Sequence, residues 1–319
     1  YGLRGMRSSK ALASSFATPE AKGLIAGTAA HGVLPLDAPL TAAFATLFMA
    51  SAHAQGWRVA VGGSQLVADA MASLAGELGA EVRTSSPVET LDDLPPCRAA
   101  LFDVDPRQLE RIAGDELPPR YRKRLRSFRF GPGIFKVDHV LDGPVPWADG
   151  ISDRAGTVHV GGSFDEIMQA EAEVAAGRHP ERPFILVAQQ SMVDPTRTTD
   201  GRQVLWSYTH VPNGSDRDMT DAVEAQIERF APGFRDRIVE RVTTRTSQLA
   251  AWNRNLVGGD IGGGSHAGLQ LVVRPRFWHP HRTPNRSLFL CSASSPPGGG
   301  IHGMAGHRAA RTALAVALD

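Results

Sequence analysis

A glycine-rich segment near the end of this 319-residue chain constrains its fold more than any other feature. Gly298, Gly300 and Gly303 satisfy the pattern G-x-G-x-x-G, between a predicted strand at Leu288–Cys291 and a predicted helix. A dinucleotide-binding βαβ unit also needs a second parallel strand and an acidic residue about 20 positions further on. Only 16 residues follow Gly303. We therefore do not expect that unit at this position.

The segment nevertheless has the physical properties of a ligand site. A helix N-terminus carries free backbone N–H groups, and glycines before it let a ligand approach the main chain. Such an end stabilises a phosphate, or the negative charge that develops at the N1/C2 carbonyl edge of a reduced flavin. The alternative is a connection that only turns a strand into a packed helix. So many glycines cost folding entropy that a plain turn does not require, which favours the ligand.

Helical patterns dominate the beginning of the chain and recur later. Residues 8–56 lack period-two alternation and predict a helical lobe. Apolar residues at spacing four predict a helix over 66–78, ending before Gly79. Between residues 216 and 234, Met219, Val223, Ile227 and Phe230 predict a helix with one apolar face.

Extended patterns fall into two groups. Short strands are predicted at 81–84, 87–91 and 99–104, in what resembles an α/β layer. Longer β-rich runs separated by turns predict an antiparallel sheet, with strands at 134–141, 157–160, 183–190 and 203–211. After Arg241 the sequence predicts loops up to the strand at 288–291.

Composition excludes several classes of protein. Lys and Arg total 34 against 33 Asp and Glu, so no net field selects nucleic acid as a partner. The longest mainly apolar stretch, residues 39–54, is shorter than the roughly 20 residues of a membrane-spanning helix. Cys97 and Cys291 are too few for a disulfide framework. We expect a folded protein of the cytoplasm.

Several other features are explained without a special site. His279, His281, His302 and His307 lack zinc-ligand spacing, so we predict no metal site. The basic run at 120–126 is predicted to be a solvated helix face, because apolar residues within and after it share helical spacing.

Two aromatic residues attract attention in the predicted sheet. Trp206 and Tyr208, two positions apart, are predicted to share one sheet face, either in an apolar pocket or in the core.

Residues 290–304, with the sequence LCSASSPPGGGIHGM, resemble the closing motif of phytoene desaturase-like FAD-dependent oxidoreductases. That family shares a superfamily with flavin amine oxidases and Rab GDP-dissociation inhibitors. The resemblance runs in order from about Gly23 to the end. Residues 62–65 resemble the start of a helix in the flavin domain. Residues 86–88 resemble the strand whose valine contacts the adenine, and residues 257–275 resemble a loop that leads toward the flavin ring.

The chain departs from the family pattern in two ways. Family members begin with a βαβ unit that carries the dinucleotide fingerprint, and nothing here supplies it. Because the sequence starts at Tyr1, we expect a fragment that lacks this N-terminal unit and holds FAD poorly. Ala305 and His307 also differ from the closing motif of close relatives.

The resemblance implies FAD as the cofactor and assigns residues to it. It places Val88 at the adenine, Gly62 and Gly63 near the pyrophosphate or the entry to the flavin domain, and Asp103 beside the cofactor at a strand end. The residues that would line the flavin follow one another before and within the last helix: Gly299, Gly300, Ile301, His302 and Met304. His302 is also a candidate for tuning the flavin or moving a proton, with helix capping as the alternative.

The implied fold is α/β (α+β), the C-terminal part of a two-domain FAD-binding oxidoreductase with discontinuous flavin-domain elements. Residues 1–60 would form a helical lobe of the substrate domain and residues 114–284 its antiparallel sheet. Residues 61–113 and 285–319 would belong to the flavin domain.

The implied activity is hydride transfer between flavin and an apolar or amphipathic small molecule, as in a phytoene dehydrogenase-like enzyme. The alternative is a non-catalytic lipid- or protein-binding module of the same fold. Peripheral membrane association and the oligomeric state are left open.

Overall fold

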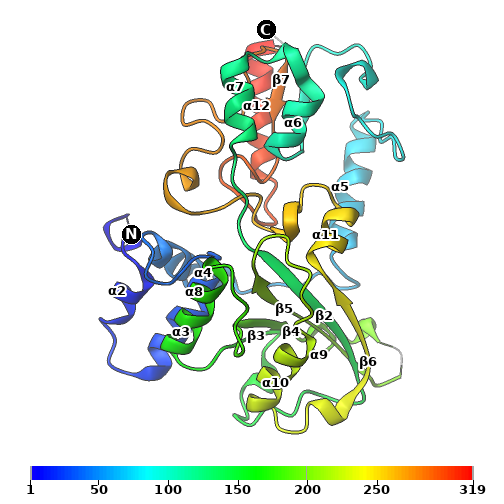
Figure 1. The fold of residues 1–319 in the computed structure, drawn as a ribbon. Coiled ribbons are helices and arrows are strands. Elements are labelled where there is room, and N and C mark those ends of the chain that lie inside the picture. Colours follow the sequence, from blue (N-terminus) through cyan, green and yellow to red (C-terminus); the bar gives the residue numbers. More distant parts are fainter. Residues whose placement is uncertain (1, 199, 318–319) are drawn as a thin grey trace. The chain divides into compact units, whose positions relative to one another are not determined.

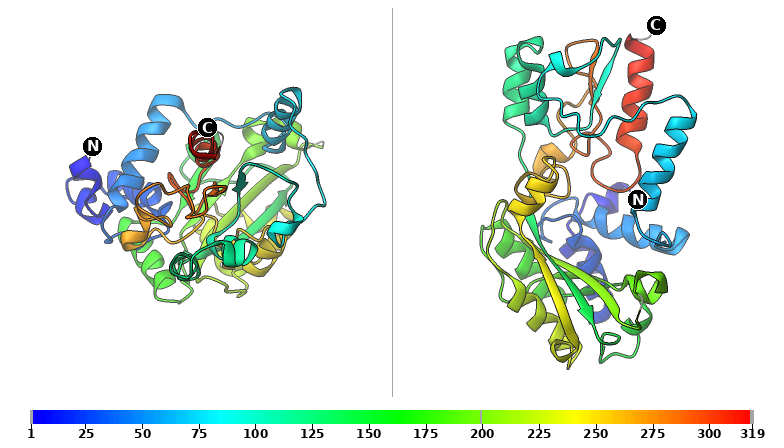
Figure 2. Two further views of the ribbon diagram at one scale, coloured as in Figure 1. Left: turned by 90° about the horizontal axis from the view of Figure 1, so that it is seen from above. Right: turned by 90° about the vertical axis from the view of Figure 1, so that its right-hand side faces the viewer.

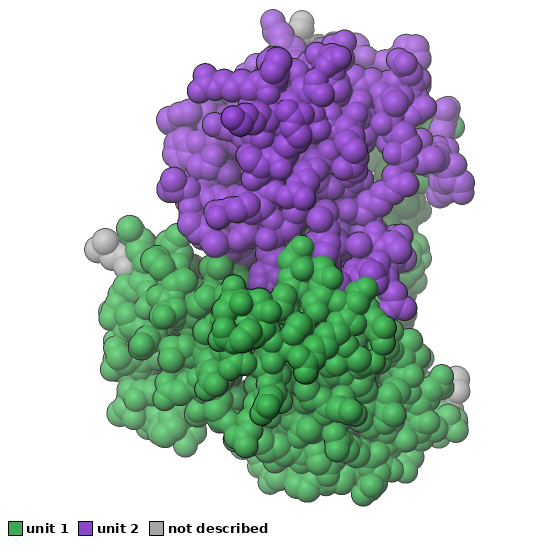
Figure 3. All heavy atoms as spheres, viewed as in Figure 1, with its two compact units in different colours: residues 1–82, 134–245 green, residues 83–133, 246–319 purple. Residues whose placement is uncertain are grey.

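The structure, a computed structural model, describes residues 2–198 and 200–317 (Figure 1). The chain divides into two compact units, which Figure 3 colours separately. Unit 1 comprises Tyr1–Val82 and Ile134–Arg245, and unit 2 comprises Arg83–Gly133 and Thr246–Asp319. Each unit is therefore assembled from two separate stretches of sequence.

The predicted helical lobe is confirmed in unit 1. Its helices are α1 (Gly2–Gly5), α2 (Ser9–Ala13), α3 (Pro19–Ala30) and α4 (Thr41–Gln55). The side chains of Ser8 and Thr18 accept backbone N–H groups at the starts of α2 and α3, as helix-capping residues do. Small residues of α3 and α4 pack closely, and α8 (Phe164–Ala175) adds Phe164 and Ile167 to the same core.

The middle of the chain forms a five-stranded sheet in the order β3-β4-β5-β2-β6 (Figures 1 and 2). The β3/β4, β4/β5 and β2/β6 pairs are antiparallel, which confirms the predicted sheet. A short helix, α9 (Gln190–Val193), follows β4. The strands are β2 (Gly133–Leu141), β3 (Thr157–Val160), β4 (Ile185–Ala188), β5 (Gln203–Val211) and β6 (Ile238–Thr244).

One face of this sheet carries the main core of unit 1. The helix predicted between residues 216 and 234 is α10 (Thr220–Phe230). Val223 and Ile227 are fully buried against sheet residues such as Val137 and Val211. The apolar spacing in the sequence therefore identified the face that packs.

The prediction of loops after Arg241 was wrong. That stretch contains the end of β6 and the helix α11 (Thr246–Trp252). β6 is an edge strand whose residues are mostly exposed and polar. Backbone pairing with β2, rather than apolar alternation, makes it a strand.

The helix after Gly63 is confirmed as α5 (Gln65–Glu77), followed by Gly79 at φ +89°. Its apolar residues Leu66, Val67, Met71 and Leu74 are 45–63% exposed. The strands predicted at 81–84 and 87–91 were wrong, because the described chain forms no strand between residues 78 and 99. A β-strand requires a neighbouring strand to which its backbone can hydrogen-bond, and these residues have no such partner in the described part of the chain.

Unit 2 contains a small parallel sheet. β1 (Ala100–Phe102) pairs with β7 (Leu288–Leu290), as the sequence predicted for both strands. Three helices accompany this sheet: α6 (Pro106–Ala113), α7 (Pro119–Arg126) and α12 (Met304–Ala317). The basic run forms α7, and Tyr121 and Leu125 are buried, which confirms the predicted helix face.

The unit boundaries differ from the predicted domain boundaries at residues 61, 113 and 285. Residues 61–82 belong to unit 1, where the Gly62 N–H donates to Asp194 Oδ2 at 2.7 Å. Residues 246–284 belong to unit 2, where Asn255 Oδ1 accepts the Asp105 N–H at 2.9 Å. These contacts between distant positions cannot be read from local pattern. The flavin and substrate roles assigned to the segments stay predictions.

Two apolar helix residues of unit 1 should respond differently to truncation. Ile227→Ala removes a fully buried side chain and should lower the free energy of unfolding by about 3 kcal/mol. Leu74→Ala, at a side chain that is 56% exposed, should change it by less than about 0.5 kcal/mol. Urea unfolding followed by circular dichroism measures both. Equal losses would contradict the assignment of the α10 face as core.

Candidate functional site

The first candidate site lies in unit 2, where β1 and β7 end side by side. Asp103 follows β1, and Cys291 follows β7 with its N–H donating to the Phe102 carbonyl at 2.9 Å. In open sheets with parallel strands, ligands bind in the crevice beyond the carboxyl ends. The side chains of Asp103 and Cys291 and the glycine-rich loop after β7 therefore lie at the edge of the sheet where a ligand is expected.

A buried arginine organises the loops at this edge. Arg274 is 1% exposed, and its Nη2 donates to the carbonyls of Gly263 at 2.8 Å, Gly262 at 3.2 Å and Ala293 at 3.3 Å. Burial lowers the pKa of Arg274, and the nearby carboxylate of Asp260 opposes this shift. The guanidinium thus joins the loop around residue 262 to the loop that follows β7.

The Asp260 carboxylate holds the same loop from the other side. Its Oδ2 accepts the N–H groups of Gly131 at 2.6 Å and Gly264 at 2.9 Å, and Oδ1 accepts that of Gly262 at 2.7 Å. A carboxylate bonded to several backbone N–H groups is a strong, charge-assisted clamp. Asp260 is 3% exposed, so solvent does not compete for it.

The closing loop requires glycine at several positions. Gly298, Gly300 and Gly303 have φ values of +108°, +138° and +61°. A Cβ on Gly299 would lie 3.1 Å from the Gly262 carbonyl oxygen. Beyond these glycines, Ile301 is 98% exposed. The loop therefore presents bare main chain and one uncovered apolar side chain.

His302 makes a contact at the start of α12, and its role toward a flavin stays a prediction. Its Nδ1 accepts the Met304 N–H at 3.1 Å, at the first residue of α12. The structure thus supports the capping alternative for this residue.

The other predicted cofactor residues are dispersed. Gly62 and Gly63 lie in unit 1, and the Gly62 N–H is already bonded to Asp194. Val88 is half-buried in the irregular segment of unit 2. Surrounding protein atoms raise the pKa of Asp103, and its backbone carbonyl accepts from Asn255 Nδ2 at 2.8 Å. Their roles toward a cofactor stay predictions.

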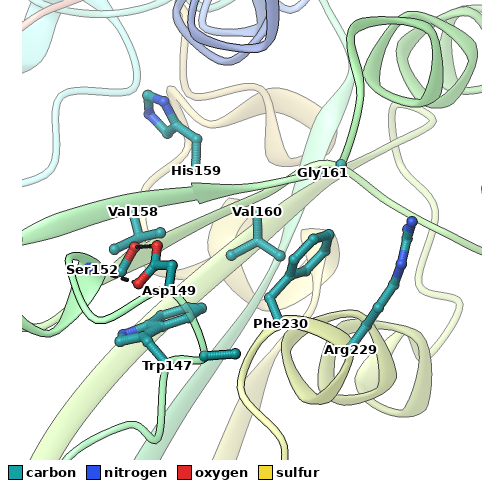
Figure 4. Close-up of a pocket in the computed structure, with 11 residues that line it drawn as sticks. Trp147, Asp149, Ser152, Val158, His159, Val160, Gly161, Arg229 and Phe230 are labelled. Atoms are coloured by element: carbon teal, nitrogen blue, oxygen red, sulfur yellow. Dashed lines mark hydrogen bonds between the residues drawn. The ribbon is translucent and has the colours of Figure 1, made fainter. Parts of the chain in front are cut away.

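The second candidate site lies in unit 1, where the edge strand β3 separates two cavities. In Figure 4, Val158 and Val160 point to one side of the strand and His159 to the other. The cavity of about 390 Å³ on the valine side is also lined by Trp147 and Phe230. The cavity of about 470 Å³ on the histidine side is lined mainly by apolar residues of α3, α4 and α8, such as Leu24, Phe48, Met49, Ala52 and Ile167.

Two uncharged histidines lie at the second cavity. His31 Nε2 and His159 Nε2 are 2.8 Å apart, so one ring donates and the other accepts. Burial and His159 lower the pKa of His31 to about 3, and burial lowers the pKa of His159 to about 4. Phe48 stacks on His31 at 4.5 Å, and Trp57 meets its edge at 6.4 Å. The cavity wall around this pair is therefore uncharged and aromatic at physiological pH.

The prediction that Trp206 and Tyr208 share one sheet face is confirmed. Their rings are 6.0 Å apart and nearly parallel, at 11°. Tyr208 is buried, and burial together with Glu171 raises its pKa well above the usual value. Sequence reasoning missed the histidine pair, because His31 and His159 are 128 positions apart and no local spacing connects them.

Within residues 2–198 and 200–317, no group of three or more His, Cys, Asp or Glu side chains is arranged to hold a metal ion. In the same part of the chain, no helix combines the length and apolar character needed to cross a membrane.

Sequence comparison finds distant relatives whose similarity extends over most of this chain. No protein-family model matches the chain. It is 27% identical to the mouse pyridine nucleotide-disulfide oxidoreductase domain-containing protein 2 over 293 residues, which cover 80% of this chain and 50% of the mouse protein. It is 25% identical to the phytoene desaturase (neurosporene-forming) of Rhodobacter capsulatus, over 79% of this chain and 52% of that protein. The chain spans about half the length of the curated relatives it matches.

These homologues fit the FAD-dependent oxidoreductase superfamily, which the chain matches in part. The resemblance found in the closing motif is thereby confirmed at the level of the superfamily. Solved structures share the fold of this chain. Putrescine oxidase bound to putrescine has a TM-score of 0.58 at 18% identity, covering 98% of this chain and 68% of its own. Cyclohexylamine oxidase from Brevibacterium oxydans has a TM-score of 0.53 at 13% identity, with 98% and 68% covered.

The predicted fold class is confirmed by the same comparison. Mixed helix and sheet with an antiparallel sheet match the C-terminal part of amine oxidase-like FAD enzymes. These likenesses concern the fold, because the identities are low.

Removal of the buried guanidinium should destabilise unit 2. Arg274→Met leaves Asp260 without its buried counter-charge and several carbonyls unbonded, so the free energy of unfolding should fall by about 3 kcal/mol. Arg276→Met is the control, since Arg276 makes one 3.2 Å bond to the Arg282 carbonyl. Urea unfolding of both variants tests this, and similar losses would contradict the organising role of Arg274.

The two free cysteines should differ in reactivity. Burial and Asp103 raise the pKa of Cys291 to about 12, whereas Cys97 is exposed. Because the thiolate is the nucleophile, Cys97→Ser should react with Ellman's reagent far more slowly at pH 8 than Cys291→Ser. The rate of Cys97→Ser should still rise about tenfold per pH unit between about pH 8 and 10. A rate that levels off in this range would contradict the raised pKa.

Proposed function

We propose that this protein is an FAD-dependent oxidoreductase of the dehydrogenase or desaturase type, acting on an uncharged, apolar or amphipathic organic molecule. The observation that carries the proposal is the exposed glycine-rich loop that opens α12 at the carboxyl ends of two parallel strands. FAD, when bound, would supply the acceptor or donor of a hydride.

The residues of the loop fit a flat, partly apolar cofactor. Gly299 and Gly300 are exposed, and the φ of Gly300 excludes ordinary side chains, so the main chain at these two residues is open to close approach. Ile301 leaves an apolar side chain with no protein cover, which a flat ring system would bury. Gly299, Gly300, Ile301, His302 and Met304 would hold the flavin, with Asp103 at the adjoining strand end.

Neighbouring residues would keep this loop in place. Arg274 and Asp260 fix the backbone on which it rests, and His302 fixes the first turn of α12. Cys291 would remain a neutral thiol at physiological pH, since burial raises its pKa to about 12. The chain would therefore contribute position and backbone dipoles rather than a mobile charge at this place.

The choice of an uncharged substrate rests on the aromatic cavity beside β3 in unit 1. Its lining contains no acidic side chain, and His159 and its partner His31 are neutral. An amine cation would lose its hydration there without gaining a counter-charge. The name of the Rhodobacter relative, a phytoene desaturase, supports the same substrate class.

Flavin binding provides the test. FAD added in excess to the purified chain should bind, weakly as expected from the sequence, and change its fluorescence. Gly300→Val should weaken this binding about tenfold or more, because φ +138° is closed to valine. Gly306→Ala is the matched control, since a Cβ there meets no atom within 4 Å and the residue lies within α12. Thermal unfolding establishes that both variants are folded.

Two results would contradict the proposal. One is the absence of FAD binding to the parent protein, which would favour the non-catalytic lipid- or protein-binding module. The other is equal FAD affinity in Gly300→Val and the parent, which would remove the loop from the cofactor site.

A further inference from the structure

A cationic cavity lies in unit 2 between α12 and residues 279–281. It has a volume of about 560 Å³. The helix contributes residues spaced three or four apart, which form one face of α12. The lining residues are His279, Pro280, His281, Met304, His307, Arg308, Arg311 and Thr312.

The positive charge of this cavity is not compensated by the protein. None of its lining residues is acidic. Within residues 2–198 and 200–317, neither Arg308 nor Arg311 forms an ion pair. By contrast, Arg122 and Arg126 of α7 both pair with Glu110, at 2.9 and 2.6 Å. Two guanidinium groups are thus left free to bind an anion in a concave site.

A buried histidine adds a second, independent observation. His281 is 4% exposed, and its Nδ1 lies 3.1 Å from the Leu290 carbonyl, so Nδ1–H donates. Its Nε2 is buried and has no partner in the described part of the chain. Burial and Arg308 lower the pKa of His281, which leaves Nε2 as an acceptor. A buried acceptor without a donor indicates that a ligand supplies the missing hydrogen-bond donor.

We propose that this cavity binds a phosphomonoester group. The anionic oxygens would bond Arg308 and Arg311, whose planar guanidinium groups match phosphate geometry. The monoanion, which a phosphomonoester with a second pKa of about 6 still populates at neutral pH, has a protonated oxygen that would donate to His281 Nε2. The Thr312 hydroxyl donates to the Arg308 carbonyl at 2.7 Å, so it holds the helix turn rather than the anion. This site adjoins the proposed flavin site at Met304, but its anion-binding residues lie outside the glycine-rich loop and do not depend on the proposed redox activity.

The first experiment measures phosphate binding by calorimetry. Inorganic phosphate and glycerol 3-phosphate should bind the parent chain, and Arg308→Gln/Arg311→Gln should weaken binding about tenfold or more. The charge-matched control is Arg120→Gln/Arg124→Gln, at exposed positions of α7. It should leave affinity within about twofold, since long-range charge alone is weak at physiological salt. Equal weakening in both double variants, or no binding to the parent, would overturn the proposal.

Two further arms identify the source of the phosphate and its independence from flavin. Sedimentation with phosphatidylcholine vesicles containing phosphatidic acid distinguishes a lipid headgroup from a soluble phosphomonoester. Either source supports the site if the Arg308/Arg311 double variant loses it and the control does not. Saturating FAD should leave phosphate affinity unchanged. Competitive displacement of phosphate by FAD would contradict a separate site.

Discussion

The arrangement of unit 2 depends on one buried ionic network, the guanidinium of Arg274 with the carboxylate of Asp260. Each group alone would be costly to bury, and each is stabilised by hydrogen bonds to backbone groups of the glycine-rich loop at 262–264. Glycines at these positions let the backbone approach both charges closely. The same guanidinium donates a hydrogen bond to the Ala293 carbonyl. This network therefore also positions the loop that leads into α12.

Local pattern predicted several of the elements that bury an apolar face. The strands at 134–141, 157–160 and 203–211 and the helix α10 follow this rule. This rule failed where strand pairing, rather than apolar pattern, determines whether a segment is a strand. β6 is a polar edge strand, and residues 81–91 include apolar residues but form no strand. For the site, the glycine pattern before α12 was readable because positive φ values demand glycine. The His31–His159 pair was not, because only tertiary structure joins positions so far apart.

The two units carry different chemistry. Unit 2 holds backbone dipoles, glycines and buried charges near strand ends, which suits an anionic or electron-rich group. Unit 1 offers a neutral aromatic cavity in which two histidines satisfy each other and remain uncharged. A protein that leaves the reaction to a bound flavin needs few acid–base residues of its own, and the absence of a paired carboxylate motif in the sequence agrees with this division.

We propose above all that the chain binds FAD at the glycine-rich loop before α12. Hydrogen–deuterium exchange, followed by mass spectrometry with and without FAD, tests it most directly. The account predicts that FAD slows exchange in peptides covering residues 298–304, while peptides from α10 keep their exchange rates. Unchanged exchange at 298–304 under conditions in which FAD is bound would contradict the claim.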